Sequence, residues 1–372
     1  MLRLSRSHLD QREVDAVARV LLEDGYLGMG REVEAFEMEL ATYLEVTPGQ
    51  VTCVSSGTAA LHLAMEAVLA PGDEVLVPSI TYVASFQAVS AAGAVPVACD
   101  VSPETVTLNL ADAERRLSAN TRAVMPVHYA SNPGDLDAVY MFAQKYGLRV
   151  IEDAAHAFGC RHKGRKVGAT GDIVCFSFDG IKNITSGEGG ALVTGDTEIA
   201  GRVRDARLLG VHKDTEKRYA GERSWEFDVT RQGYRYHMSN VMAAIGRVQL
   251  RRFEEEFKPK RIALARHYRE RLAGLSRVGL LDTDLGPVVP HIFPVRILDG
   301  MRDKVSMALE DRQIQTGLHY KPNHLLTKFG GGRISLPVAE RLYRELLSLP
   351  LHPDLTEADV DRVVDAVAEA LQ

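Results

Sequence analysis

Apolar and polar residues alternate in blocks along the first 250 residues, and these blocks predict strands and helices in turn. Short apolar runs predict strands at 51–54, 74–77, 95–99, 123–127, 149–151, 173–178 and 189–194. Apolar residues at helical spacing predict helices at 10–24, 31–45, 59–69, 83–92, 111–117 and 135–146. Continuous apolar strands that alternate with helices indicate an α/β fold with a mostly parallel sheet covered on both faces.

The character of the chain changes beyond residue 239. A long stretch rich in Ala, Arg, Glu and Leu, 239–275, predicts a helix that breaks or kinks near Pro259. Short strands near 291–297, a helix at 302–311 and a closing helix from about 357 follow. We therefore expect a large domain over residues 1–251 and a smaller α+β domain over 252–372.

Composition and charge narrow the class of protein. The chain has 372 residues, a net charge of −6, and Lys and Arg residues scattered along its length, so no basic block indicates a nucleic acid or membrane partner. Its apolar runs are shorter than a membrane span needs, and its first residues lack the features of a signal peptide. A cytoplasmic enzyme is expected. The four cysteines lack metal-ligand spacing, so we expect buried free thiols and no metal site.

Four features fall at the carboxyl ends of predicted strands, where α/β sheets bind ligands. Ser56-Gly57-Thr58 opens a helix and is either a phosphate cradle or a plain N-cap. Tyr82 is either a stacking platform or a core ring, and Asp153 is either a partner for a cationic nitrogen or a structural acid. Lys182, before a run of small residues, is either a Schiff-base nucleophile or a solvated loop lysine.

Taken together, the four features match the needs of one cofactor. Pyridoxal 5′-phosphate (PLP) requires a phosphate cradle, a stacking ring, an acid beside its pyridine nitrogen and a lysine for its aldehyde. The sequence therefore predicts a PLP site at this edge of the sheet.

Longer motifs surround these residues. They include Pro78-Ser79-Ile80-Thr81-Tyr82, Glu152-Asp153-Ala154-Ala155-His156, Phe176-Ser177-Phe178, Lys182-Asn183-Ile184-Thr185-Ser186-Gly187-Glu188-Gly189-Gly190, Met238-Ser239-Asn240 and His319-Tyr320. Over nearly its whole length the chain resembles the sugar-nucleotide aminotransferases of the DegT/StrS type, a branch of the fold-type I PLP enzymes.

The resemblance implies a role for each matching residue. Lys182 would be the Schiff-base lysine and would move the proton between Cα and C4′, while Asp153 would pair with the pyridine nitrogen. His156 would contact the 3-hydroxyl of the cofactor. The other implied cofactor-binding residues are Gly57, Thr58 and Ser177 at the phosphate, Tyr82 on the ring, Asn183 and Arg235. His319 and Tyr320 would lie near the sugar or its diphosphate.

The resemblance also implies the reaction and the assembly. An amino group would pass from glutamate to a keto carbon of a nucleotide-linked sugar, in the synthesis of amino sugars for a cell-surface polysaccharide or a glycoside. The enzyme would be a homodimer with shared active sites, each completed by residues 233–240 of the other subunit.

Two segments depart from the family pattern. Arg235 stands where the family commonly has an Asn that reaches the partner's phosphate, and a charge-assisted contact there would be stronger. The segment 126–132 lacks the usual glycine and glutamine, so the fit of the sugar is expected to differ.

Three alternatives remain. A PLP-dependent sugar dehydratase or deoxygenase has His in place of the lysine, and Lys182 argues against it. A non-catalytic PLP-fold sensor would carry an added binding region, whereas the first 50 residues look integral to the fold. A nicotinamide oxidoreductase needs a glycine fingerprint between a strand and a helix, and neither Gly28-Met29-Gly30 nor the 186–190 run has that setting.

Overall fold

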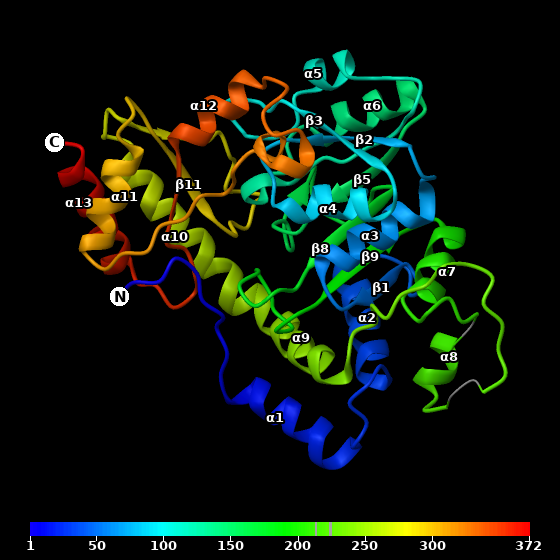
Figure 1. Cartoon of the computed structure of the whole chain (residues 1–372). Helices are drawn as coiled ribbons and strands as arrows, with labels where there is room; N and C mark the ends of the chain where they lie inside the picture. The colour runs from blue at the N-terminus through cyan, green and yellow to red at the C-terminus, as the bar shows by residue number, and fades with distance from the viewer. Residues whose placement is uncertain (213, 223–224) are drawn as a thin grey trace.

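A seven-stranded sheet forms the centre of the molecule (Figure 1). The computed structural model describes residues 1–212, 214–222 and 225–372. The strand order is β1-β9-β8-β5-β4-β2-β3, and β9 alone runs antiparallel to its neighbours. The strands are β1 (Val51–Val54), β2 (Glu74–Pro78), β3 (Val95–Cys99), β4 (Thr121–Val124), β5 (Arg149–Asp153), β8 (Ile173–Ser177) and β9 (Gly190–Thr194).

Helices cover both faces of this sheet, because alternate side chains of each strand point to opposite faces. Ile151, Ile173 and Leu192 pack toward α3 and α4 in one apolar cluster, whereas Phe176 and Val193 pack toward α2 in another. The helices of this region are α1 (Gln11–Arg19), α2 (Arg31–Leu44), α3 (Gly57–Val68), α4 (Val83–Ala91), α5 (Leu110–Arg115), α6 (Leu136–Tyr146), α7 (Thr197–Ala206) and α8 (Asp214–Tyr219).

A buried ion pair ties α2 to β1. The guanidinium of Arg207 lies 2.6 Å from Glu37 Oε1 and also donates to the carbonyl of Cys53. The backbone N–H of Cys53 donates to the same Glu37 oxygen at 2.8 Å, and Tyr219 donates to the other oxygen at 2.7 Å. Every charge of this pair is therefore compensated inside the core.

A long helical run leads from the large sheet to a small one. It consists of α9 (Asn240–Arg252), a π-helical turn η3 (Phe253–Phe257) and α10 (Lys258–Leu272). The predicted irregularity near Pro259 is present, since the π turn ends directly before α10 and Pro259 lies in the first turn of α10, a position that tolerates proline.

The small sheet is antiparallel, in the order β10-β11-β12. Its strands are β10 (Val278–Leu280), β11 (Phe293–Ile297) and β12 (Leu346–Leu349). The helices that accompany it are α11 (Arg302–Asp311), α12 (Pro337–Glu345) and α13 (Glu357–Ala370). The pair β6 (Arg161–His162) and β7 (Arg165–Lys166) forms a separate hairpin. A division of the chain at residue 252 remains our proposal.

The first residues of the chain pack beside the small sheet, and both termini lie on that side of the molecule (Figure 1). Leu2 exchanges backbone hydrogen bonds with Gln313 and Gln315, and Leu4 accepts one from Leu351. Further along, the hydroxyl of Ser7 donates to the carbonyl of Gly180. Residues 2–7 therefore connect the small sheet to the loop that carries Lys182.

Candidate active site

A cavity of about 400 Å³ opens at the carboxyl ends of β1, β2, β5 and β8. Its volume lies in the range of roughly 300–1,000 Å³ that is typical of small-molecule sites. Nine of the eleven predicted site residues line it: Gly57, Thr58, Tyr82, Asp153, His156, Ser177, Lys182, His319 and Tyr320. Asn183 and Arg235 lie outside it.

The start of α3 forms one end of the cavity. Ser56 caps this helix, since its hydroxyl accepts the N–H of Ala59 at 3.1 Å. The N–H groups of the first turn, at Gly57 and Thr58, lie at the positive end of the helix dipole. A Cβ atom on Gly57 would lie 2.7 Å from Cβ of Ser177, so only glycine permits this close approach of the start of α3 to the end of β8. The arrangement is suited to a phosphate group.

Asp153 is the last residue of β5, and its carboxylate is held at both oxygens. Oδ2 accepts the hydroxyl of Ser85 at 2.7 Å, and Oδ1 accepts the N–H of Ala155 at 3.2 Å. The side chain is buried and lines the cavity. A carboxylate fixed in this way can face a cationic ring nitrogen.

Lys182 lies in a tight turn after β8. Its N–H donates to the carbonyl of Asp179 at 3.0 Å, and the Asp179 carboxylate accepts the N–H of Ile181. Burial lowers the pKa of the Lys182 amine to about 8, although Asp153 and Asp179 act in the opposite direction. Within the described part of the chain no side chain forms a hydrogen bond to this amine. It is thus more readily neutral than an exposed lysine.

Aromatic and imidazole rings form another part of the cavity wall. Nε2 of His156 lies 3.1 Å from the hydroxyl of Tyr320, and the rings of Tyr82 and Tyr320 are 5.6 Å apart at 46°. Burial, together with the charge of Lys182, holds the pKa of His156 well below its usual value and lowers that of His319 to about 4. Both imidazoles are therefore neutral near pH 7.

Two residues of the segment 126–132 form hydrogen bonds with the main chain of this wall. The hydroxyl of Tyr129 donates to the carbonyl of His319, and that of Ser131 donates to the carbonyl of His156. Two residues of the segment that departs from the family pattern are therefore bonded to two of the predicted site residues.

The two predicted residues outside the cavity have other contacts. The amide of Asn183 is buried and donates to the carbonyls of Phe158 and Val289, both at 3.1 Å. Arg235 is exposed and forms an isolated β-bridge with Leu208, next to the end of β1. Within one chain, Arg235 does not reach the cradle.

The cavity also contains residues that the sequence did not single out. Thr81, Asp179 and Glu188 line it, and Glu188 has its pKa raised by partial burial and by Asp179. Asp179 could have been found, because it follows Ser177 by two residues at the same strand end. Ser85 could not, because its contact with Asp153 joins residues 68 positions apart.

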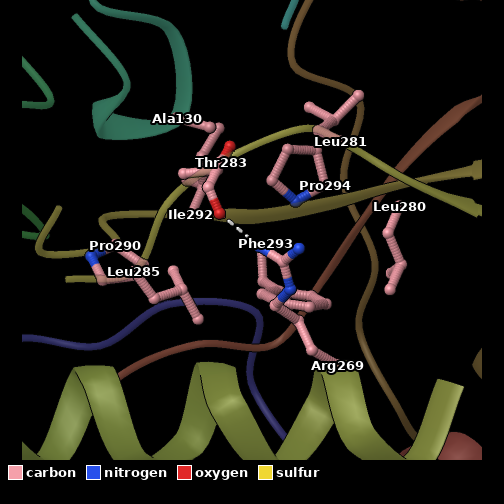
Figure 2. Close-up of a pocket in the computed structure, with 10 residues that line it drawn as sticks. All are labelled: Ala130, Arg269, Leu280, Leu281, Thr283, Leu285, Pro290, Ile292, Phe293 and Pro294. Carbon is pink, nitrogen blue, oxygen red and sulfur yellow. Dashed lines mark hydrogen bonds between the residues drawn. The ribbon is translucent and has the colours of Figure 1, made fainter. Parts of the chain in front are cut away.

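A second pocket lies between the small sheet and α10 (Figure 2). Arg269 reaches up from the helix and donates to the carbonyl of Thr283, surrounded mostly by apolar side chains. Its volume of about 30 Å³ has room for roughly one or two water molecules. It is too small for a sugar or a cofactor.

Two kinds of feature are absent from the described residues. No helix there is both long and apolar enough to cross a bilayer. No group of three or more His, Cys, Asp or Glu side chains there could hold a metal ion. All four cysteines are free and buried, as expected.

Comparison with known proteins was made by sequence and by structure. The model of the DegT/DnrJ/EryC1/StrS aminotransferase family matches residues 7–368. Among solved structures, the aminotransferase TlmJ from Streptoalloteichus hindustanus is 36% identical with a TM-score of 0.92, over 100% of this chain and 99% of that one. The sugar aminotransferase CalS13 from Micromonospora echinospora is 27% identical with a TM-score of 0.90, over 99% and 100%.

The third structure bears on the cofactor. Spr1654 from Streptococcus pneumoniae, solved in its PLP form, is 26% identical with a TM-score of 0.90, over 99% of this chain and 98% of that one. A PMP form of the same protein is equally similar in fold, with a TM-score of 0.91. The fold class and the cofactor expected from the sequence are confirmed.

The residues of the cavity fit PLP on their own geometry. Gly57, at the start of α3, approaches Ser177 so closely that a Cβ atom would clash with it, and both residues line the cavity beside the positive end of the helix dipole, which suits a phosphate. The unbonded amine of Lys182 and the fixed carboxylate of Asp153 line the same cavity. These are the groups that an aldehyde and a pyridine nitrogen require.

Proposed function

Because the chain belongs to the DegT/DnrJ/EryC1/StrS aminotransferase family and is a PLP-dependent sugar aminotransferase, we propose that it aminates a keto carbon of a nucleotide-linked sugar. Glutamate is the proposed amino donor. The observation that carries the proposal is the Lys182 amine, which lies buried and unbonded in the same cavity as Asp153 and the Gly57–Thr58 cradle.

The cofactor contributes the reactive groups, and the chain holds them in place. When bound, PLP supplies an aldehyde that combines with amines and a ring that accepts electrons from a substrate carbon. Gly57, Thr58 and Ser177 would bind its phosphate, Tyr82 would stack on its ring, and Asp153 would pair with the ring nitrogen. His156, whose pKa is lowered by burial, would form a hydrogen bond with the 3-hydroxyl as a neutral imidazole.

Lys182 is the proposed acid and base. Because its pKa is about 8, a substantial fraction of the amine is neutral near physiological pH. Its Nζ takes a proton from Cα of the donor amino acid and delivers one to the carbon of the sugar that receives nitrogen. Because this amine lines the same cavity as the cradle and Asp153, one group can serve both transfers.

The sugar and its diphosphate would lie against His319 and Tyr320, which line the cavity. We further propose a homodimer in which Arg235 reaches the cofactor phosphate in the partner's site. This is supported by the exposure of apolar side chains in the segment before Arg235, where Trp225 is 86% and Phe227 58% exposed. Large aromatic side chains exposed in this way are available for contact with another chain. A cytoplasmic location remains part of the proposal.

The assignment of Lys182 can be tested by reduction with borohydride. The reagent should fix the cofactor to the peptide that contains Lys182, as detected by mass spectrometry, and Lys182→Ala should remove both this label and the visible absorbance band. A label on another lysine would contradict the assignment. Glutamate should then convert the band of the wild-type protein, and an unchanged band with both glutamate and glutamine would favour a dehydratase or a sensor.

The substrate can be tested with a panel of keto-sugar nucleotides and nitrogen-15-labelled glutamate. An aminated product that carries the label, formed from the nucleotide-linked sugar but not from the free sugar, would support the proposal. Labelled product from the free sugar alone would contradict the nucleotide part.

The shared site can be tested by mixing two inactive variants, Lys182→Ala and Arg235→Ala. In a random mixture of C2 dimers, half are hybrids with one intact site, so about a quarter of wild-type activity should return. No recovery after subunit exchange would show that the two residues serve the same chain.

A further inference from the structure

Two buried hydroxyl groups and the Asp153 carboxylate form a line of hydrogen bonds, with the carboxylate at one end. Ser85, the third residue of α4, lies with its Oγ 2.7 Å from Asp153 Oδ2. Oγ1 of Thr81 lies 2.8 Å from the same Ser85 oxygen. All three side chains are buried, and Ser85 itself does not line the cavity.

The direction of the line follows from counting protons. Ser85 has one hydroxyl proton and two acceptors within reach, Asp153 Oδ2 at 2.7 Å and the carbonyl of Tyr82 at 3.2 Å. The bond to the carboxylate is shorter and charge-assisted, so it takes the proton. Thr81 must then be the donor to Ser85, because Ser85 has no second proton to give.

The far end of the line is fixed by the C-terminal part of the chain. The amide of Asn323 donates to the carbonyl of Thr81 at 2.8 Å and to that of Ser79 at 3.1 Å. Asn323 follows Tyr320 by three residues, so the loop that supplies part of the cavity wall also holds the turn at 79–82. The hydrogen-bonded line is therefore held both by α4, which carries Ser85, and by the C-terminal loop that carries Asn323.

We propose that Ser85 is a positioning residue, which with Thr81 donating into it fixes the Asp153 carboxylate in one rotation about its Cβ–Cγ bond. Ala155 holds the other oxygen from the main chain, so Ser85 is the side chain that completes the clamp. The inference rests on the role proposed above for Asp153. Without the Ser85 hydroxyl, Oδ2 loses its donor and the carboxylate can turn away from the cofactor.

The test is titration of the apoprotein with PLP, followed by absorbance, with thermal unfolding of each apoprotein as a record of folding. Ser85→Ala should bind PLP about tenfold more weakly, as expected for loss of a hydrogen bond to a charged group. Thr81→Val should lose less, because it removes only the donor behind Ser85. Ser85→Thr keeps the hydroxyl and should restore binding, and Ser90→Ala, on the same helix outside the cavity, is the matched control.

A double-mutant cycle separates this inference from its premise. In an Asp153→Asn background the effect of Ser85→Ala should shrink to about threefold or less, because a neutral amide accepts a weaker bond. Unchanged PLP affinity in Ser85→Ala, an equal loss in both backgrounds, or failure of Ser85→Thr would each overturn the role of Ser85. If Asp153→Asn itself bound PLP and turned over like the wild type, the proposed role of Asp153 would fail instead.

Discussion

Substitution of Gly190 by alanine should displace the backbone of Ser56 and Gly57, which forms the phosphate cradle. Gly190 opens β9, where it pairs with Val54 on one side and Ser177 on the other. A Cβ at this position would lie 2.5 Å from the carbonyl oxygen of Ser56, 2.6 Å from its carbonyl carbon and 2.7 Å from the nitrogen of Gly57. All three are backbone atoms, so no change of rotamer can relieve the contact.

The size of the effect follows from the contact and the length of the chain. Overpacking of a filled site costs roughly 1–3 kcal/mol, and rigid backbone neighbours place Gly190→Ala near the upper end, at about 2–3 kcal/mol. Unfolding entropy of about 2.1 cal/mol/K per residue gives about 0.8 kcal/mol/K for this chain. The melting temperature of the apoprotein should therefore fall by about 3–4 °C.

The assay compares thermal unfolding with and without PLP. At a ligand concentration one hundred times Kd, binding stabilises the wild-type protein by about 2.7 kcal/mol, and a tenfold weaker Kd reduces this to about 1.4 kcal/mol. Gly190→Ala should therefore lose about half of the cofactor-dependent gain, because the N–H groups of the cradle are displaced. This second quantity distinguishes a distorted cradle from a general loss of stability.

Gly201→Ala is the control of opposite sign. Gly201 lies within α7, and a Cβ there would meet no atom within 4 Å. This variant should gain up to about 1 kcal/mol from helix propensity and keep the full gain with PLP. The reasoning from the contact is refuted if the Gly190→Ala apoprotein has the same melting temperature as the wild type, or if PLP stabilises the variant as much as the wild type.

Three further predictions concern other parts of the molecule. The rate of PLP uptake by the apoprotein should rise with pH up to about 8 and then level, because the neutral Lys182 amine is the reactive form; stopped-flow absorbance that still rises toward pH 10 would contradict the lowered pKa. Glu37→Gln should lower the free energy of unfolding by about 3 kcal/mol in guanidinium titrations, because Arg207 stays buried without its counter-charge, and a loss below about 1 kcal/mol would show that the pair is dispensable. Tyr82→Ala should weaken PLP binding by about tenfold whereas Tyr82→Phe keeps the ring and should bind like the wild type; equal losses in both would assign the effect to the hydroxyl.

The elements of the large sheet could be predicted because their signal is local. Apolar runs such as 74–77 and 173–178 became strands within one or two residues, and the helices between them followed from spacing. The antiparallel direction of β9 could not be predicted, since an apolar run has the same composition in either direction. The short α12 and β12 were also missed, because their burial depends on a sheet assembled from distant segments.

The site was predictable where chemistry and position coincide. Lys182, Asp153 and Gly57 follow strands directly, so their convergence at one edge follows from the topology of the sheet. Asn183 is adjacent in sequence to Lys182, but the tight turn there directs its amide into the core. The Ser85 and Thr81 hydroxyls gave no signal, because serine and threonine near a helix start most often serve as caps.

The packing of residues 2–7 has a consequence for the order in which the chain can fold. Leu2 pairs with residues more than 300 positions later, and Leu4 with Leu351, so these contacts cannot form until nearly the whole chain has been synthesised. Loop closure over such a distance is slow relative to local structure. The large sheet can therefore assemble before residues 2–4 reach their partners, and the Ser7–Gly180 hydrogen bond joins this late segment to the turn that carries Lys182.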